Sequence, residues 1–253
     1  MRPCDGILRL FRGTAAVDAT SALAEDAFRA WRTVLQGRAK RAALSVIAIG
    51  VTVAALASAA AGESAGFDQD PVGSVPAGWQ CGSTDGGSPR WTVQAHDGAP
   101  SAPNVLKQSG SGSFPWCVAP GAAFADGFVE VKFSPLAGEE DRAGGVVWRW
   151  KDSDTYYVAR GESRVEGGIS HLSVAVMQRG RLRILRDVDA PVTARAWHTL
   201  RVEFEGAAIR VLLDGTLRIE FADGRIAGGG RVGVWTSADS VTAFDDFSFQ
   251  RAP

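Results

Sequence analysis

The stretch GVVWRWKDSDTYYVAR at residues 145–160 places two short runs of β-branched and aromatic residues on either side of a polar turn. This pattern is typical of a hairpin of two half-buried strands. Because side chains alternate between the faces of a strand, it predicts that Trp148 and Trp150 share one face and that Tyr156 and Arg160 share one face. The hairpin carries more aromatic residues than a core requires, and indole, phenol and guanidinium groups together form a surface on which sugar rings stack.

Strand signals of the same kind recur along the body of the chain at the short spacings of a β-sandwich. The predicted strands cover residues 90–95, 104–108, 114–118, 127–133, 145–150, 155–160, 169–177, 181–187, 197–205, 209–213, 217–221, 231–235 and 241–249. Thirteen strands without a convincing helix predict an all-β fold of two stacked antiparallel sheets over residues 89–250. Residues 62–88, which are rich in Gly, Pro, Ser and Asp, are predicted to be a surface segment that leads into the sandwich.

The clearest turn lies in the run IRVLLDGTLRIEF at residues 209–221. Its Asp214-Gly215 pair supplies the two positive-φ positions that a type I′ hairpin turn requires. Upstream of this hairpin, apolar and charged residues alternate over residues 200–205. One face of this sheet is therefore predicted to be core and the other to face water.

Residues 1–61 are predicted to be a leader. Residues 42–61 are uncharged and mostly apolar, and they follow Arg38, Lys40 and Arg41. A basic flank, an apolar core and a small-residue end are typical of an export signal, whereas about 20 apolar residues also suffice for an uncleaved helical membrane anchor. Under either alternative the positive-inside rule predicts that the body is exported, to the periplasm, the cell envelope or the medium, with membrane contact confined to the N-terminal segment. Residues 1–41 are assigned no function.

The charge of the body differs from that of the leader. The chain has 253 residues with 27 Lys and Arg against 28 Asp and Glu, and eight of the basic and four of the acidic residues lie in residues 1–61. The remaining 19 basic and 24 acidic residues give the body a net charge of −5. An acidic body argues against nucleic acid as a partner.

The cysteines also separate into leader and body. Cys4 lies in the leader, whereas Cys81 and Cys117 lie in the body. An even pair in an oxidising compartment predicts a disulfide between Cys81 and Cys117. Two cysteines without a neighbouring histidine do not form a zinc site.

Five stretches of the body carry a resemblance. They are FDQDPVGSVPAGW at 67–79, PNVLKQ at 103–108, GGVVWRWKDSDTYYVAR at 144–160, AWHTLRVE at 196–203 and VGVWTSADSVTAFDDF at 232–247. In this order and spacing they resemble bacterial laminin-G-like proteins of the 3-keto-disaccharide hydrolase domain family, a branch of the concanavalin A-like lectin/glucanase superfamily. The resemblance spans about residues 66–249. It implies a jelly-roll sandwich whose concave sheet is the usual place for a glycan, and it is interrupted at residues 161–168.

Catalytic chemistry has little support in the sequence. Retaining glycosidases need two carboxylates about 5 Å apart, and laminarinase-type members of the superfamily carry them in a Glu-x-Asp-x-Glu strand. The chain has no such triplet, so we assign no catalytic residue. The family name implies cleavage of 3-keto glycosides by a hydrolase or lyase, but a shared name is a fold-level analogy.

The candidate ligand-binding residues are those expected to meet on the concave sheet. They are Trp148, Trp150, Tyr156, Arg160, Trp235 and Glu130. The tryptophans could equally fill the core between the sheets, whereas an arginine is costly to bury without a partner. Weaker candidates for a calcium site are Asp239, Asp245 and Asp246, since carboxylates are the ligands that calcium prefers.

The sequence therefore favours an exported carbohydrate-binding or carbohydrate-associated domain with a glycan as partner. Two alternatives remain, an enzyme acting on 3-keto-disaccharides or related glycosides and an adhesion or scaffold module that binds protein. A lectin needs exposed aromatic and polar groups, an enzyme needs convergent catalytic groups, and a scaffold needs an apolar surface patch.

Overall fold

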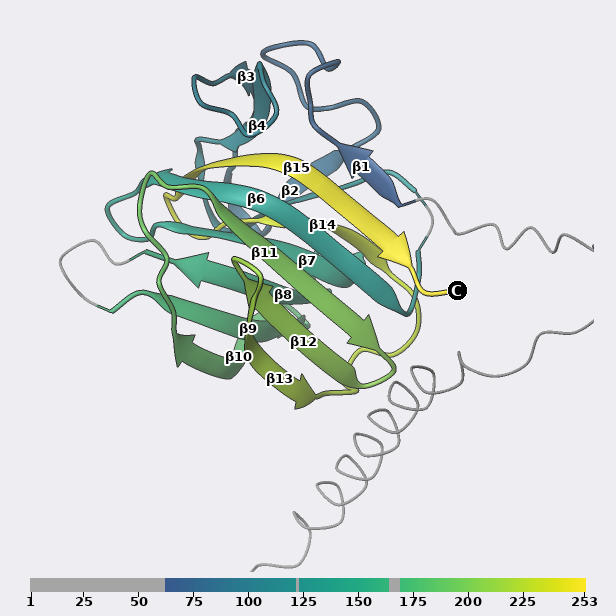
Figure 1. The fold of residues 1–253 in the computed structure, drawn as a ribbon. Helices are drawn as coiled ribbons and strands as arrows, with labels where there is room; N and C mark the ends of the chain where they lie inside the picture. The colour runs from purple at the N-terminus through teal and green to yellow at the C-terminus, as the bar shows by residue number, and fades with distance from the viewer. Residues whose placement is uncertain (1–61, 122, 164–168) are drawn as a thin grey trace, which may run out of the picture. The chain divides into compact units, whose positions relative to one another are not determined.

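The computed structural model describes residues 62–121, 123–163 and 169–253, and these residues form fifteen strands without a helix (Figure 1). The predicted all-β class is confirmed for this part of the chain. Within it, no helix has the length and hydropathy needed to cross a membrane. The predicted leader, with its apolar segment at residues 42–61, lies outside the described residues.

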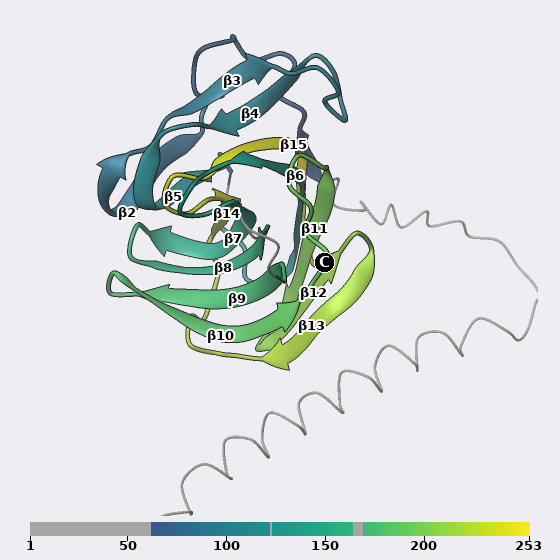
Figure 2. The same cartoon turned by 90° about the vertical axis from the view of Figure 1, so that its left-hand side faces the viewer.

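The strands form two antiparallel sheets, as predicted, which lie face to face (Figures 1 and 2). Sheet A has the order β13 (Thr216–Ala222), β12 (Ala208–Leu213), β11 (His198–Glu205), β6 (Gly127–Ala137), β15 (Val241–Arg251), β4 (Asn104–Gln108) and β3 (Trp91–Ala95), with β1 (Glu63–Ala65) also paired to β15. Sheet B has the order β10 (Arg181–Asp189), β9 (His171–Gln178), β8 (Thr155–Glu162), β7 (Ala143–Asp152), β14 (Arg231–Trp235), β5 (Ser111–Val118) and β2 (Gln80–Ser88).

Each of the thirteen predicted strands has a counterpart, but β1 and β2 were not expected. Both lie in residues 62–88, where only a surface segment was predicted. The sequence of β2 has no apolar alternation because β2 is the edge strand of sheet B and most of its side chains face solvent. Cys81 on β2 lies opposite Cys117 on β5, and a disulfide joins the two residues. This bond fastens the edge strand to the sheet.

The main core fills the space between the sheets. In sheet A, the apolar residues of the alternating run, Leu200, Val202 and Phe204, are buried in this core, which confirms the predicted two-faced sheet. In sheet B, Val146 and Tyr157 contribute to the same core. Asp214 and Gly215 have φ values of 50° and 73°, as the predicted type I′ turn requires.

The outer face of sheet A is a ladder of ion pairs. Arg201 lies 3.0 Å from Glu203 and 3.5 Å from Glu130, and Arg210 lies 2.7 Å from Glu203. Glu130 is on β6, directly opposite Arg201 on β11. The expectation that Glu130 meets the aromatic residues is therefore wrong, because nothing in a strand's own sequence tells which of two sheets it joins.

Candidate functional site

A bulge in β7 decides which aromatic residues reach the outer face of sheet B. The register of β7 with β8 shifts between Trp148 and Asp152, and Arg149 has a φ of 48°. A bulge adds one residue and resets the alternation of side chains. Trp148 and Arg149 consequently both point inward, and Trp150 points outward. The prediction that Trp148 and Trp150 share a face is wrong.

Trp148 belongs to the core between the sheets. It is fully buried, and its ring stacks on Tyr157 with centroids 5.2 Å apart. Trp150 belongs instead to a second apolar cluster, which also contains Trp116, Tyr156 and Trp235. We call these four residues the outer aromatic cluster. The sequence alone could not separate Trp148 from Trp150, since the bulge depends on packing elsewhere.

Tyr156 and Arg160 lie on the same face of β8, as the alternation of side chains predicts. Tyr156 is in the outer aromatic cluster, and the guanidinium carbon of Arg160 lies 5.7 Å from the ring centroid of Trp235. Arg160, Gly145 and Trp235 are direct neighbours across β8, β7 and β14. Because Gly145 has no side chain, the arginine can reach over the intervening strand to the indole. Any Cβ at Gly145 would lie 2.3 Å from the carbonyl oxygen of Ala159.

The outer face of sheet B is concave. The Thr84 hydroxyl on β2 lies 3.0 Å from the Tyr156 hydroxyl on β8, although three strands separate β2 from β8. In a flat sheet these strands would be about 19 Å apart, given a spacing of about 4.8 Å. The sheet must therefore curve toward this face. Burial raises the pKa of Tyr156, so its hydroxyl stays protonated and can donate a hydrogen bond.

The outer aromatic cluster is a second small core rather than an open stacking surface. Trp116 is 5% exposed, Trp150 is 7% exposed, and Tyr156 and Trp235 are fully buried. Trp116 and Trp150 pack against each other with ring centroids 5.1 Å apart. Their indole N–H groups are buried and have no acceptor among the described residues. Arg160 lies beside this cluster and keeps part of its side chain exposed.

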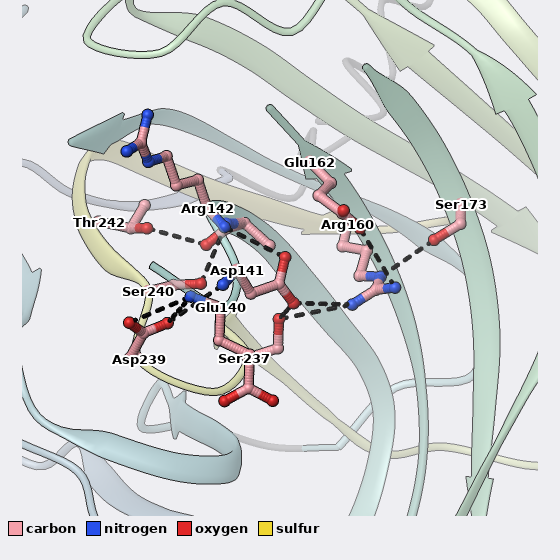
Figure 3. A network of polar contacts seen from close by, with 11 residues as sticks. Glu140, Asp141, Arg142, Arg160, Glu162, Ser173, Ser237, Asp239, Ser240 and Thr242 are labelled. Atoms are coloured by element: carbon pink, nitrogen blue, oxygen red, sulfur yellow. Dashed lines mark hydrogen bonds and ion pairs between the residues drawn. The ribbon is translucent and has the colours of Figure 1, made fainter. Parts of the chain in front are cut away.

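Arg160 is the centre of a polar network at one end of the concave face (Figure 3). Its guanidinium group lies 3.5 Å from the carboxylate of Asp141 and 3.4 Å from that of Glu162. It also donates to the hydroxyl groups of Ser173 at 3.2 Å and Ser237 at 3.4 Å, and Ser237 in turn donates to Asp141. Arg160 is therefore held in one orientation while 16% of its side chain remains exposed.

The carboxylate of Asp239 organises the loop that carries Asp141. It accepts hydrogen bonds from the backbone N–H groups of Glu140 at 3.1 Å and Asp141 at 3.1 Å (Figure 3). It also accepts one from the backbone N–H group of Glu139 at 2.7 Å. Burial opposes its ionisation, but these hydrogen bonds prevail and hold the pKa of Asp239 below its ordinary value. Gly138 begins the loop with a φ of 146°, and a Cβ there would collide with the Asp141 carbonyl oxygen.

The three calcium candidates do not form a common site. Asp239 is bound to the loop at residues 139–141. Asp245 is buried and accepts two hydrogen bonds from Ser101, whereas Asp246 forms a 2.7 Å ion pair with Lys132. Among the residues that the structure describes, no cluster of three or more His, Cys, Asp or Glu side chains could hold a metal ion.

Several polar residues of this face were not identified from the sequence. Asp141 lies in the loop before β7, Glu162 is the last residue of β8, Ser173 lies within β9, and Ser237 lies in the segment that follows β14. Their approach to Arg160 is a tertiary effect. On the neighbouring strands, His171 lies opposite Glu162 and Asp189, and Asp187 lies opposite Ser173. The alternation of Asp187 and Asp189 on β10 was the one local signal that could have indicated this polar end.

Comparison with solved structures identifies the fold. The carbohydrate-binding module CBM66 from Bacillus subtilis superposes with a TM-score of 0.54 and 18% identity, covering 67% of this chain and 93% of that chain. A β-glucanase from Bacillus licheniformis superposes with a TM-score of 0.50 and 13% identity, covering 76% of this chain and 98% of that chain. No protein-family model and no curated protein matches the sequence. At these identities the likeness shows that the chain shares the two-sheet β-sandwich fold of these proteins.

Proposed function

We propose that this protein is an exported carbohydrate-binding domain whose ligand lies on the concave face of sheet B, next to Arg160. The observation that carries the proposal is the polar network at that end of the face. A guanidinium group fixed by two carboxylates and two serine hydroxyls presents donors and acceptors in a set geometry. Such convergent groups beside aromatic residues are suited to the hydroxyl groups of a sugar.

Two further observations support this proposal. The indole N–H groups of Trp116 and Trp150 lack an acceptor within the described part of the chain, and most buried donors in proteins have one. An oxygen atom of a bound sugar could supply it if the face opens slightly. The solved structures with the same fold include a carbohydrate-binding module and a β-glucanase. Export is inferred from the basic and apolar leader sequence.

The experiment is to compare the parent protein with Arg160→Ala and Arg160→Lys on a broad glycan array, followed by calorimetric titration of the best ligand. We expect the alanine variant to lose about 1 to 3 kcal/mol of binding free energy, the range for hydrogen bonds to charged groups. The lysine variant keeps the positive charge but loses the planar guanidinium group with its several N–H donors, so it should also bind weakly. Arg201→Ala, on the opposite outer face, is the matched control and should bind normally. Loss of thermal stability with unchanged binding would make Arg160 structural.

We propose as the second candidate that the chain is a member of the 3-keto-disaccharide hydrolase domain family that acts on its ligand. The five sequence stretches support this assignment, and Asp141 and Glu162 are carboxylates that lie within 3.5 Å of the Arg160 guanidinium group. Incubation of the purified protein with 3-keto-disaccharides and chromatography of the products tests it. Cleavage that is abolished in Glu162→Gln would favour the enzyme over the binding domain.

A further inference from the structure

The charges around Arg160 bear on which glycans the concave face accepts. A single exposed arginine in a sugar site is commonly a partner for a carboxylate or sulfate group of the ligand. Here, Asp141 and Glu162 already lie within 3.5 Å of the guanidinium group. The positive charge of Arg160 is thus compensated within the protein, and an anionic ligand would have to compete with two carboxylates.

More carboxylates follow on the adjacent strands. Asp187 lies opposite Ser173, whose hydroxyl contacts Arg160, so Asp187 is on the same face. Asp189 lies opposite His171, and the His171 Nδ1 atom is 3.5 Å from Asp187 and 3.9 Å from Asp189. Both aspartates are well exposed, with 46% and 70% of their side chains accessible. The polar end of the face therefore presents acceptors to a ligand.

The other cationic groups nearby do not offset this negative charge. The guanidinium group of Arg142 points away from Arg160 (Figure 3) and donates to the carbonyl oxygen of Gly138. Arg231 lies over the ring of Trp150, 4.4 Å from its centroid, in the aromatic part of the face. Asp141, Glu162, Asp187 and Asp189 thus outnumber the one guanidinium group at the polar end. Glu139 and Glu140 in the adjoining loop are exposed and add to the negative potential.

We infer that the polar end of the concave face selects glycans without anionic groups, because the guanidinium group of Arg160 is neutralised by Asp141 and Glu162 and the other charged groups at this end are carboxylates. This inference rests on the proposed function and names the chemical class of its ligand. The carboxylates accept hydrogen bonds from sugar hydroxyls, whereas they repel uronic acid and sulfate groups. The nearly buried hydroxyls of Ser173 and Ser237 keep Arg160 directed at the same ligand.

The test uses an array of matched pairs, in which a neutral oligosaccharide and its carboxylated or sulfated counterpart have the same linkage and length. The anionic member of each bound pair should bind about five- to tenfold more weakly at low salt, since one unit charge pair in water at 4 Å corresponds to about a fivefold change in affinity. The difference should shrink at 0.5 M salt, where exposed charges are screened. An amine-bearing counterpart should bind at least as well as the neutral one.

Variants that remove one charge each show which carboxylates weaken the binding of anionic glycans. Glu162→Gln and Asp187→Asn should each reduce the discrimination against the anionic member, and Glu220→Gln on the outer face of sheet A is the control that should leave it unchanged. Thermal melts check that all three variants fold. Anionic glycans that bind as tightly as their neutral counterparts would overturn the inference while leaving the proposed function intact. Failure to bind any glycan on the array would instead overturn the proposed function itself.

Discussion

Arg149 offers the sharpest test of the bulge that shapes the concave face. Its side chain is 3% exposed, and its guanidinium group donates to the carbonyl oxygens of Ala125 at 3.1 Å and Ile226 at 3.0 Å, and to that of Gly206. Asp126 lies 3.6 Å away. Burial lowers the pKa of Arg149, but an arginine remains charged at neutral pH. One cation therefore holds three loops against the end of β7.

We expect Arg149→Met to lower the free energy of unfolding by about 3 to 5 kcal/mol. The substitution leaves three carbonyl groups without their donor, at about 1 kcal/mol or more each when they stay dry, and removal of one partner from a buried charge interaction costs a similar total. The loss is a large part of the 5 to 15 kcal/mol that stabilises an ordinary domain. Arg218→Met, at an exposed site on β13, is the control and should change the free energy of unfolding by less than about 0.5 kcal/mol.

The backbone at this position gives a second, independent prediction. Because Arg149 has a φ of 48°, glycine should be about 1 kcal/mol less destabilising than alanine there. Urea denaturation followed by tryptophan fluorescence measures both effects, provided that the m-values agree. If Arg149→Met lost less than about 1 kcal/mol, or if alanine were better tolerated than glycine, the assignment of the bulge and of the buried cation would be wrong.

Three further predictions concern the rest of the molecule. Reduction of the disulfide between Cys81 and Cys117, which are 36 residues apart, should lower the free energy of unfolding by roughly 3 to 4 kcal/mol in denaturant titrations with and without reductant. Asp239 has a lowered pKa in the folded protein, so its ionised carboxylate contributes to stability above pH 3.8, and this contribution is lost as the pH falls further. The difference in unfolding free energy between the parent and Asp239→Ala should therefore shrink below that pH. N-terminal sequencing of secreted material should find a mature chain that begins near Ala60 or Gly62, whereas full-length protein in the membrane fraction would indicate an anchor.

Local regularity decided which site residues could be predicted. Tyr156 and Arg160 lie on a strand without a bulge, so the two-residue period gave their shared face correctly. Trp148 and Trp150 lie on either side of a bulge at Arg149, whose side chain binds loops from distant parts of the chain. The two-residue period of β7 does not reveal those contacts. The prediction for Glu130 was wrong for another reason, since the sequence pattern of a strand contains no information about which sheet the strand joins.

The contacts at the polar end of the concave face could not be predicted from local sequence patterns at all. Asp141 and Ser237 are 96 residues apart in the sequence, yet their side chains are hydrogen-bonded beside Arg160. They meet because Asp239 draws the loop at residues 138–142 toward the segment that follows β14. No periodicity in a single strand predicts such a contact. The arginine was predictable because its charge needs a partner, but the identity of that partner was not.

The burial of the outer aromatic cluster also limits how strongly one sugar unit can bind. Trp235 and Tyr156 have no accessible surface, so stacking on their rings contributes nothing unless the face opens. Binding then depends on hydrogen bonds to Arg160 and its neighbouring carboxylates, each with a net contribution of about 1 to 3 kcal/mol. Part of that gain offsets the entropy lost on association, so a single unit should bind with a dissociation constant near the millimolar range. Tighter binding requires a longer glycan that also contacts the exposed aspartates of β10, since each added unit brings hydrogen bonds without a second association cost.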